Sequence, residues 1–325
     1  MNVLLWHVHG SWTTAFVQGR HRYLVPVTAD RGPYGLGRAR TYPWPDTVDE
    51  VTPEELARAD VDVVILQRPE EIALAETWLG RRIGRDVPAI FVEHNTPKQG
   101  NVPNSRHPLA DRADLLIVHV THFNALFWDT GSTRTAVVEH GVVAPAARYT
   151  GELPRLAVVV NEPVRRWRVT GTDLLPRFAE VAPLDVFGMG VAELPDRLGL
   201  PADRLAVHED LPQHRMQEEV ARRRAYLHLC RWTSLGLSLI EAMAMGMPVV
   251  VLAATEAVAA VPPDAGVLAT RVETLVDGAR RLVAEPAGAH RLGTRAREAA
   301  QARYGLDRFL ADWDRLLEEE VCASR

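Results

Sequence analysis

Lysine is almost absent from this chain: of its 37 lysines and arginines, only Lys98 is a lysine. A single lysine in a loop disfavours chemistry that needs a Schiff base, such as pyridoxal phosphate catalysis. Cysteine is also rare, because Cys230 and Cys322 lie far apart and neither has the spacing of a metal site. Neither a disulfide scaffold nor a zinc knuckle is therefore indicated, and we expect a reducing, cytoplasmic location.

Long apolar runs are missing as well. No stretch approaches the roughly 18 uninterrupted apolar residues of a membrane span, and residues 1–10 lack the basic start and cleavage site of a signal peptide. The 37 basic and 42 acidic residues give a net charge of -5. Because nucleic acids and anionic membranes attract basic surfaces, we expect neither a nucleic-acid partner nor a transmembrane segment.

What the sequence does contain is a repeated alternation of short apolar runs with longer segments of helical periodicity. This pattern is typical of parallel strands joined by helices, with helices covering both faces of the sheet. We expect helices at 53–59, 70–79, 172–181, 213–223, 237–245, 272–285 and 307–321. We expect strands at 3–8, 23–27, 61–66, 89–93, 115–119, 136–139, 156–160, 184–187, 205–208, 225–229, 248–252 and 266–269.

The length of 325 residues favours two domains. The segment 143–154 has no periodicity and contains proline and glycine, so we expect the linker there. We predict an α/β protein with two Rossmann-like, doubly wound domains, at 1–147 and 148–305, that face a central cleft. A last amphipathic helix, within 306–325, is expected to pack back across the linker towards the first domain.

The most informative segment is RWTSLGLSLIEAMAMGMPVV at 231–250, between two predicted strands. Gly236 permits a tight turn, Ser238 is the expected N-cap, and the helix that follows ends at Gly246. Free amides at a helix start suit a diphosphate. The carboxylate of Glu241, one turn later, lies too close to that position to bind phosphate itself, but it suits the two vicinal hydroxyls of a ribose.

This segment resembles the nucleotide-sugar signature of the retaining family 4 glycosyltransferases, which have the two-domain GT-B fold. The family pattern begins Glu-Gly-Phe-Gly-Leu, and here Thr233, Ser234 and Leu235 occupy its first three places. The resemblance implies donor binding by Thr233, Gly236, Leu237, Ser238 and Glu241. Since the first family Glu contacts the donor sugar, Thr233 implies either a different donor or lost activity. The matching positions are Gly236, Leu237, Glu241, Ala242, Met243, Ala244, Gly246, Pro248, Val249 and Val250.

The resemblance also assigns positions in the first half. His94, after a predicted strand, falls where the family has a histidine that holds the donor sugar near the reacting bond. Gly10 and Ser11 fall where the family has a glycine-rich loop near the acceptor, although an ordinary strand-to-helix turn explains them almost as well. His122 is a further candidate for the acceptor site.

The family binds the diphosphate with an arginine and a lysine after the first strand of its second domain. Here Arg165 lies near the arginine position, and Thr170 occupies the lysine position. We expect Arg165 and Arg168 to take the catalytic role of binding the diphosphate, because a guanidinium binds phosphate oxygens with two hydrogen bonds. Arg166 is an alternative to them. The other interpretation is that this segment is a solvated basic loop without a ligand.

Together these features predict a glycosyltransferase that moves a sugar from a nucleotide-diphosphate sugar to a small polar acceptor with retention. No metal and no further cofactor are implied. Two alternatives stay open: a protein that binds a nucleotide sugar without transferring it, and a sugar-nucleotide epimerase.

Overall fold

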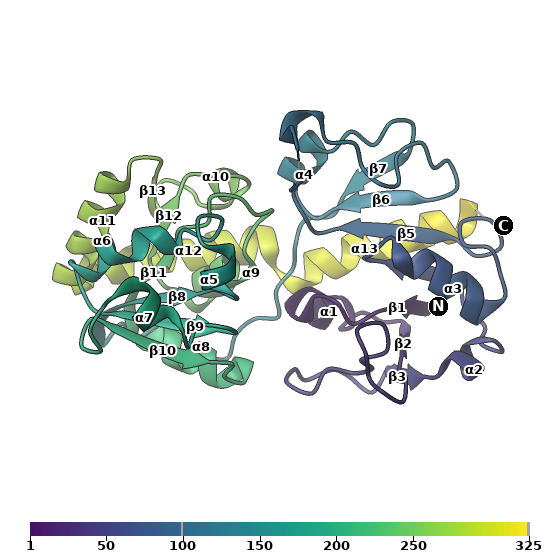
Figure 1. Ribbon diagram of the computed structural model, residues 1–325, viewed down its shortest axis with the longest axis horizontal. Helices are drawn as coiled ribbons and strands as arrows, with labels where there is room; N and C mark the ends of the chain where they lie inside the picture. Colours follow the sequence, from purple (N-terminus) through teal and green to yellow (C-terminus); the bar gives the residue numbers. More distant parts are fainter. Residues whose placement is uncertain (99, 324–325) are drawn as a thin grey trace. The chain divides into compact units, whose positions relative to one another are not determined.

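The structure is a computed structural model that describes residues 1–98 and 100–323. The chain forms two compact units (Figure 1), one made of residues 1–143 and the C-terminal segment from Leu306, the other of residues 144–305. Each unit contains one sheet of parallel strands with helices on both faces. The predicted fold class, α/β with two Rossmann-like doubly wound domains, is confirmed.

The sheet of the first unit has the strand order β3-β2-β1-β4-β5-β6-β7. Its strands are β1 (Asn2–Leu5), β2 (Arg22–Pro26), β3 (Val48–Val51), β4 (Val63–Leu66), β5 (Ala89–Glu93), β6 (Leu116–His119) and β7 (Arg134–Val137). Its helices are α1 (Gly10–Phe16), α2 (Pro53–Leu56), α3 (Glu70–Leu79), the 3-10 turn η1 (Val102–Asn104), α4 (His122–Phe127) and α13 (Leu306–Ala323).

The last helix, α13, belongs to this first unit because its apolar face packs on α1. The ring of Trp313 makes edge contacts with Trp12 and Phe16, at centroid distances of 5.8 and 5.0 Å. Arg308 donates to the carbonyl oxygens of Glu139 and His140 at 3.1 and 2.6 Å. Aromatic burial of this kind supplies much of the packing energy of a small core.

The sheet of the second unit has the order β10-β9-β8-β11-β12-β13. Its strands are β8 (Leu153–Val159), β9 (Leu184–Gly188), β10 (Leu205–Glu209), β11 (Arg223–His228), β12 (Val249–Leu252) and β13 (Gly266–Ala269). Its helices are α5 (Pro163–Arg166), η2 (Thr172–Leu174), α6 (Leu175–Ala179), α7 (Leu194–Leu198), α8 (Gln213–Arg222), α9 (Leu237–Met245), α10 (Ala257–Ala260), α11 (Val272–Ala284) and α12 (Pro286–Tyr304).

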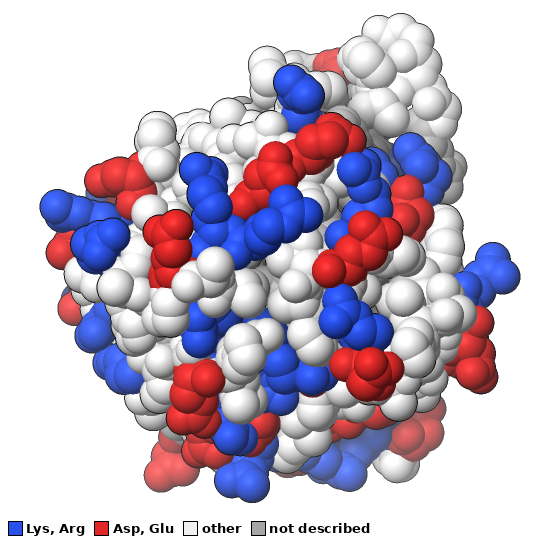
Figure 2. Space-filling view, turned by 90° about the vertical axis from the view of Figure 1, so that its left-hand side faces the viewer, with Lys and Arg blue, Asp and Glu red and all other residues white. Residues whose placement is uncertain are grey.

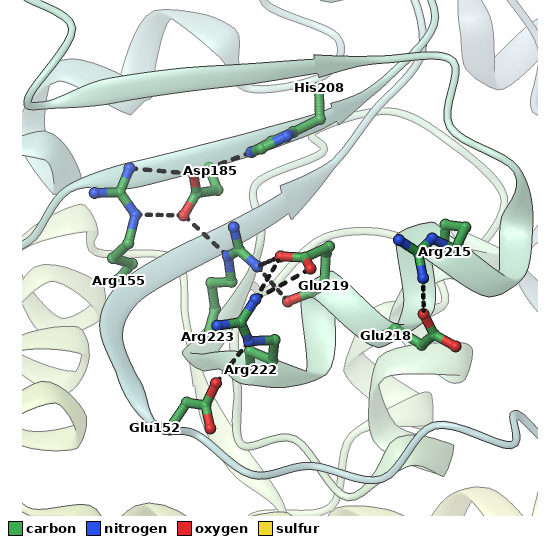
Figure 3. Close-up of polar contacts among 9 residues, drawn as sticks. All are labelled: Glu152, Arg155, Asp185, His208, Arg215, Glu218, Glu219, Arg222 and Arg223. Atoms are coloured by element: carbon green, nitrogen blue, oxygen red, sulfur yellow. Dashed lines mark hydrogen bonds and ion pairs between the residues drawn. The ribbon is translucent and has the colours of Figure 1, made fainter.

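A buried carboxylate, Asp185 on β9, joins its own strand to three others of this second sheet (Figure 3). It accepts hydrogen bonds from Arg155 on β8 at 2.5 and 3.1 Å, from Arg223 on β11 at 3.0 Å, and is paired with His208 on β10 at 3.2 Å. Arg223 also donates to the Glu219 carboxylate on α8. Burial alone would raise the pKa of Asp185, but the arginine hydrogen bonds outweigh it, so the pKa is lowered.

Charge on one face of the second unit is mixed. On the face that Figure 2 shows, basic and acidic side chains are interspersed rather than gathered into a patch of one sign.

Within the described residues, no helix combines the length and the apolar character that crossing a bilayer requires.

The structure corrects several details of the sequence prediction; for example, β7 is Arg134–Val137 rather than 136–139, and α2 ends at Leu56 rather than at residue 59. Strand β3 was not predicted, and β1 ends at Leu5 rather than at residue 8. The predicted linker reached residue 154, but β8 already begins at Leu153. The amide of Tyr149 donates to the Met245 carbonyl, and the amide of Thr150 to the Ala221 carbonyl, so the chain joins the second unit before that strand starts.

Candidate functional site

Both sheets have a point where the strand order reverses direction. In the second unit, β8 lies between β9 and β11, so the loops that follow β8 and β11 leave their strands towards opposite sides. In open parallel sheets, ligands bind outside the carboxyl ends of the strands at such a point. These two loops contain the residues predicted to bind the nucleotide-sugar donor, except Leu237, Ser238 and Glu241, which lie on α9.

The first of them, residues 160–173, we call the arginine loop. Arg165 and Arg168 are 73% and 71% exposed, so both guanidinium groups are accessible. Arg165 pairs with Glu162, and Arg168 donates to Asp173 at 3.0 Å. A diphosphate would compete with these two carboxylates for the arginines.

The backbone of the arginine loop is strained. Glu162 and Trp167 have φ angles of 52° and 34°, in the left-handed region that such residues rarely adopt. Gly171 has a φ of 74°, and a Cβ there would lie 2.1 Å from the Leu229 carbonyl oxygen. Thr170 is buried and donates to the Trp167 carbonyl at 3.0 Å. Thr170 therefore stabilises the turn, at the position where the resemblance led us to look for a lysine.

Arg231 is a site residue that the sequence prediction missed. It lies just after β11 and binds both oxygens of Asp173, at 2.6 and 3.0 Å, and also donates to the carbonyl of Arg168 at 2.8 Å. This contact joins the arginine loop to the loop 229–236. An arginine next to a recognised motif was the only signal in the sequence.

The second loop leads into α9, whose N-cap is Gly236 and has no side-chain capping bond. The prediction that Ser238 is the N-cap is therefore wrong. Ser238 is the second residue of the helix, and its hydroxyl accepts a hydrogen bond from the Tyr226 hydroxyl at 2.8 Å. A Cβ at Gly236 would lie 2.5 Å from His228 Cε1, so glycine is the residue that lets the helix start approach β11.

Glu241 lies on the second turn of α9 and is only 7% exposed. Its Oε1 accepts a hydrogen bond from Gln213 Nε2, on the first residue of α8, at 3.2 Å. Thr233 and Leu237 are partly exposed on the loop and at the helix start. The structure thus places Gly236, Leu237, Ser238 and Glu241 in the first two turns of one helix and its N-cap, and the loop before this helix contacts the arginine loop through Arg231.

In the first unit, His94 directly follows β5. Its ring centroid lies 4.1 Å from that of His9 and 5.0 Å from that of Trp12. Its Nε2 is buried and has no hydrogen-bond partner within the described residues. Burial, and then the neighbouring His9 and His140, lower its pKa well below the ordinary range, so His94 is neutral near pH 7.

The other predicted first-unit residues lie at helix starts. Gly10 and Ser11 open α1, directly after its N-cap His9, rather than forming a separate loop. His122 is exposed at the start of α4, where the N-cap Thr121 accepts from the Asn124 amide. His94 is brought close to the start of α1, whereas His122 follows the neighbouring strand β6.

Across residues 1–98 and 100–323, no three carboxylate, histidine or cysteine side chains are grouped so that they could hold a metal ion.

The second unit matches a known family by sequence. Residues 198–299 match the glycosyl transferases group 1 family. Among curated proteins, none is detectably similar to this chain.

Solved structures are similar over nearly the whole chain. Sucrose-phosphate synthase from Thermosynechococcus elongatus superposes with a TM-score of 0.75 at 14% identity over 100% of both chains. HepE from Anabaena, in complex with UDP and glucose, gives 0.70 at 15% identity over 98% of this chain and 100% of that one. A glycosyltransferase from Rickettsia africae gives 0.67 at 11% identity over 98% of each chain. The fold of this protein is therefore that of the GT-B glycosyltransferases, and its segment 198–299 matches glycosyl transferases group 1.

Proposed function

We propose that this protein is a glycosyltransferase that moves a sugar from a nucleotide-diphosphate sugar to a small polar acceptor, with retention and without a metal ion. The observation that carries the proposal is the arrangement at the β8/β11 reversal, where Arg231 ties the arginine loop to the loop that leads into α9. Cations and helix amides at one switch point form a site suited to a diphosphate.

The donor would bind mainly to the second unit. Glu241 would accept hydrogen bonds from the ribose hydroxyls, in competition with Gln213. The amides of Leu237 and Ser238, at the uncapped start of α9, would donate to the diphosphate. Thr233 would lie nearest the sugar, and its hydroxyl would replace the carboxylate of the family pattern.

The barrier to transfer is cleavage of the bond between the anomeric carbon and the phosphate. Arg165 and Arg168 would stabilise the negative charge that develops on the departing diphosphate. Retention would follow from attack on the same face, with the leaving phosphate accepting the acceptor proton. His94 would hold a hydroxyl of the donor sugar as a neutral hydrogen-bonding group, and Gly10, Ser11 and His122 would bind the acceptor.

The test is incubation of the protein with a panel of nucleotide sugars and small polar acceptors, with and without EDTA. We expect release of nucleoside diphosphate and a glycosylated product, unchanged by EDTA, whose anomeric configuration by NMR matches the donor. A new sugar nucleotide would instead identify an epimerase. Thermal stabilisation by nucleotide sugars without any turnover would identify a binding protein, and either result contradicts the proposal.

A further inference from the structure

The first sheet also reverses its strand order, and three residues around that point, His9, Arg68 and Lys98, have no role in the proposed function. β1 lies between β2 and β4, so the reversal falls between the carboxyl ends of β1 and β4. His9 follows β1, and Arg68 is the second residue after β4. Lys98 lies in the loop after β5, which is the neighbour of β4 in the sheet. Three adjacent parallel strands therefore lead to His9, Arg68 and Lys98.

Arg68 is held firmly in place. Its Nε donates to Glu71 at 2.7 Å, one terminal nitrogen donates to the Pro33 carbonyl at 3.0 Å, and its guanidinium carbon lies 4.2 Å from the centroid of the Tyr34 ring. The other terminal nitrogen is buried and has no partner in the described part of the chain. A buried donor without a partner is unfavourable, and a bound acceptor atom would relieve it.

Glu71 positions Arg68 but does not cancel the positive charge around the β1/β4 reversal. Its carboxylate also accepts from the backbone amides of Gln67 and Arg68, at 2.6 and 3.2 Å. Lys98 contributes a second cation, and its Nζ donates to the Asn95 side-chain oxygen at 2.7 Å. Arg68, Glu71 and Lys98 together therefore carry a net positive charge.

The two cations lie near His9. The pKa of His9 is lowered to about 4, mainly by burial and then by the positive charges of Lys98 and Arg68. The imidazole of His9 is therefore neutral near pH 7 and lies against the neutral ring of His94. The region around the β1/β4 reversal thus combines the cations of Arg68 and Lys98 with two neutral imidazole rings.

We propose that Arg68 and Lys98 bind a small oxyanion, a phosphate or a carboxylate, at the β1/β4 reversal of the first sheet. On the basis of the proposed function, we assign this oxyanion to the acceptor. The acceptor is therefore an anionic rather than a neutral small molecule. The unpaired Arg68 nitrogen would donate to one oxygen, and Lys98 would balance the charge.

The experiment measures the affinity of the full-length protein for methyl phosphate and for acetate by NMR titration. Every protein in this titration carries Arg165→Gln and Arg168→Gln, so that the two exposed arginines of the proposed diphosphate site do not contribute. Arg68→Gln and Lys98→Gln are compared with Arg58→Gln, which removes an exposed arginine just after α2. We expect about tenfold weaker binding for Arg68→Gln and about threefold for Lys98→Gln, and no change for Arg58→Gln.

A preference for methyl phosphate identifies a phosphorylated acceptor, and a preference for acetate identifies an acceptor with a carboxylate. Equal affinities in Arg68→Gln, Lys98→Gln and Arg58→Gln would overturn the proposal, as would the absence of any binding. If Arg68→Gln does not fold because Glu71 loses its partner, Lys98→Gln decides alone. Nucleoside diphosphate release is measured separately in proteins that keep Arg165 and Arg168, so loss of the proposed function with intact oxyanion binding, or the reverse, is distinguishable.

Discussion

The guanidinium of Arg231 binds both carboxylate oxygens of Asp173, and with the hydrogen bond to the Arg168 carbonyl this contact joins the two loops at the reversal point of the second sheet. Asp173 also accepts from Arg168 at 3.0 Å, so a single carboxylate orients two arginines. Arg168 lies on the arginine loop, and Arg231 lies on the loop that leads into α9. We infer that Asp173 sets the geometry of the proposed diphosphate site although it cannot bind an anion itself.

We predict that Asp173→Asn weakens UDP binding by about threefold to tenfold, because Arg168 and Arg231 lose their shared anchor. The free energy of unfolding should fall by only about 1 kcal/mol, since the pair is partly exposed. Isothermal titration calorimetry gives the affinity. Asp196→Asn, which changes an exposed aspartate on α7, is the control and should bind UDP like the wild type. Equal affinities for both variants would remove the positioning role of Asp173.

Gly236→Ala should cost about 1–3 kcal/mol of stability and weaken UDP binding, because a Cβ at this position would lie 2.5 Å from His228 Cε1. Either the helix start or His228 must shift. Gly288→Ala is a matched control inside α12, where the nearest atom would lie 3.5 Å from the new Cβ. Since alanine favours helix over glycine, Gly288→Ala should stabilise by up to about 1 kcal/mol. Chemical denaturation measures both, and a neutral Gly236→Ala would contradict the packing argument.

The sequence was sufficient for elements whose limits are marked by local chemistry. The predicted bounds 237–245 of helix α9 agree with the structure because Gly236 and Gly246 flank it, although the N-cap is Gly236 rather than Ser238; Gly246 adopts a φ of 90°. Strand β5 was predicted equally well because it is a continuous apolar run between a proline and a histidine. Strand β3, VDEV at the sheet edge, was missed because Asp49 and Glu50 interrupt any such run.

The site was predicted only where a motif marks it. The positions on α9 and in the arginine loop could be read from the sequence, but the Arg231 contact could not, because Asp173 lies 58 residues away along the chain. Arg68 was missed for the same reason: its importance depends on strands β1, β4 and β5 lying side by side. Long-range contacts of this kind are set by the fold rather than by local sequence.

Asp185→Asn should lower the free energy of unfolding at pH 7 by about 3 kcal/mol, because Arg155 loses its carboxylate partner and the buried Arg223 keeps only Glu219. The pKa of Asp185 is lowered in the folded protein, so its stabilising effect is present above about pH 4 and is lost as the pH falls further. Urea unfolding between pH 7 and pH 3 should therefore show a smaller acid loss in the variant. Glu218→Gln, which breaks the exposed pair with Arg215 in Figure 3, should change stability by less than about 1 kcal/mol. A similar cost for both variants would contradict this account.

Acid should also destabilise the protein through His119. This side chain is 0% exposed, and neither ring nitrogen has a partner within the described residues. Burial, and then the nearby His107, lower its pKa to about 4, so the unfolded chain takes up a proton that the folded state excludes as the pH falls below about 6.5. His119→Leu should become more stable relative to the wild type by about 2 kcal/mol between pH 7.5 and pH 5.

Thermal unfolding at several pH values measures this difference. The control is His214→Leu on α8, which changes an exposed histidine and should leave the pH dependence as in the wild type. If His119→Leu and the wild type lose stability in parallel as the pH falls, His119 does not exclude a proton in the folded state.

The most direct test of the account is the affinity of Glu241→Ala for UDP, measured by isothermal titration calorimetry beside Gln213→Ala. Loss of the charge-assisted hydrogen bonds to the ribose should weaken binding at least tenfold, or roughly 1.4 kcal/mol, in Glu241→Ala. Gln213→Ala, which removes only the neighbour that donates to this carboxylate, should bind within about threefold of the wild type. Wild-type affinity in a folded Glu241→Ala protein would contradict the assignment of the nucleotide site.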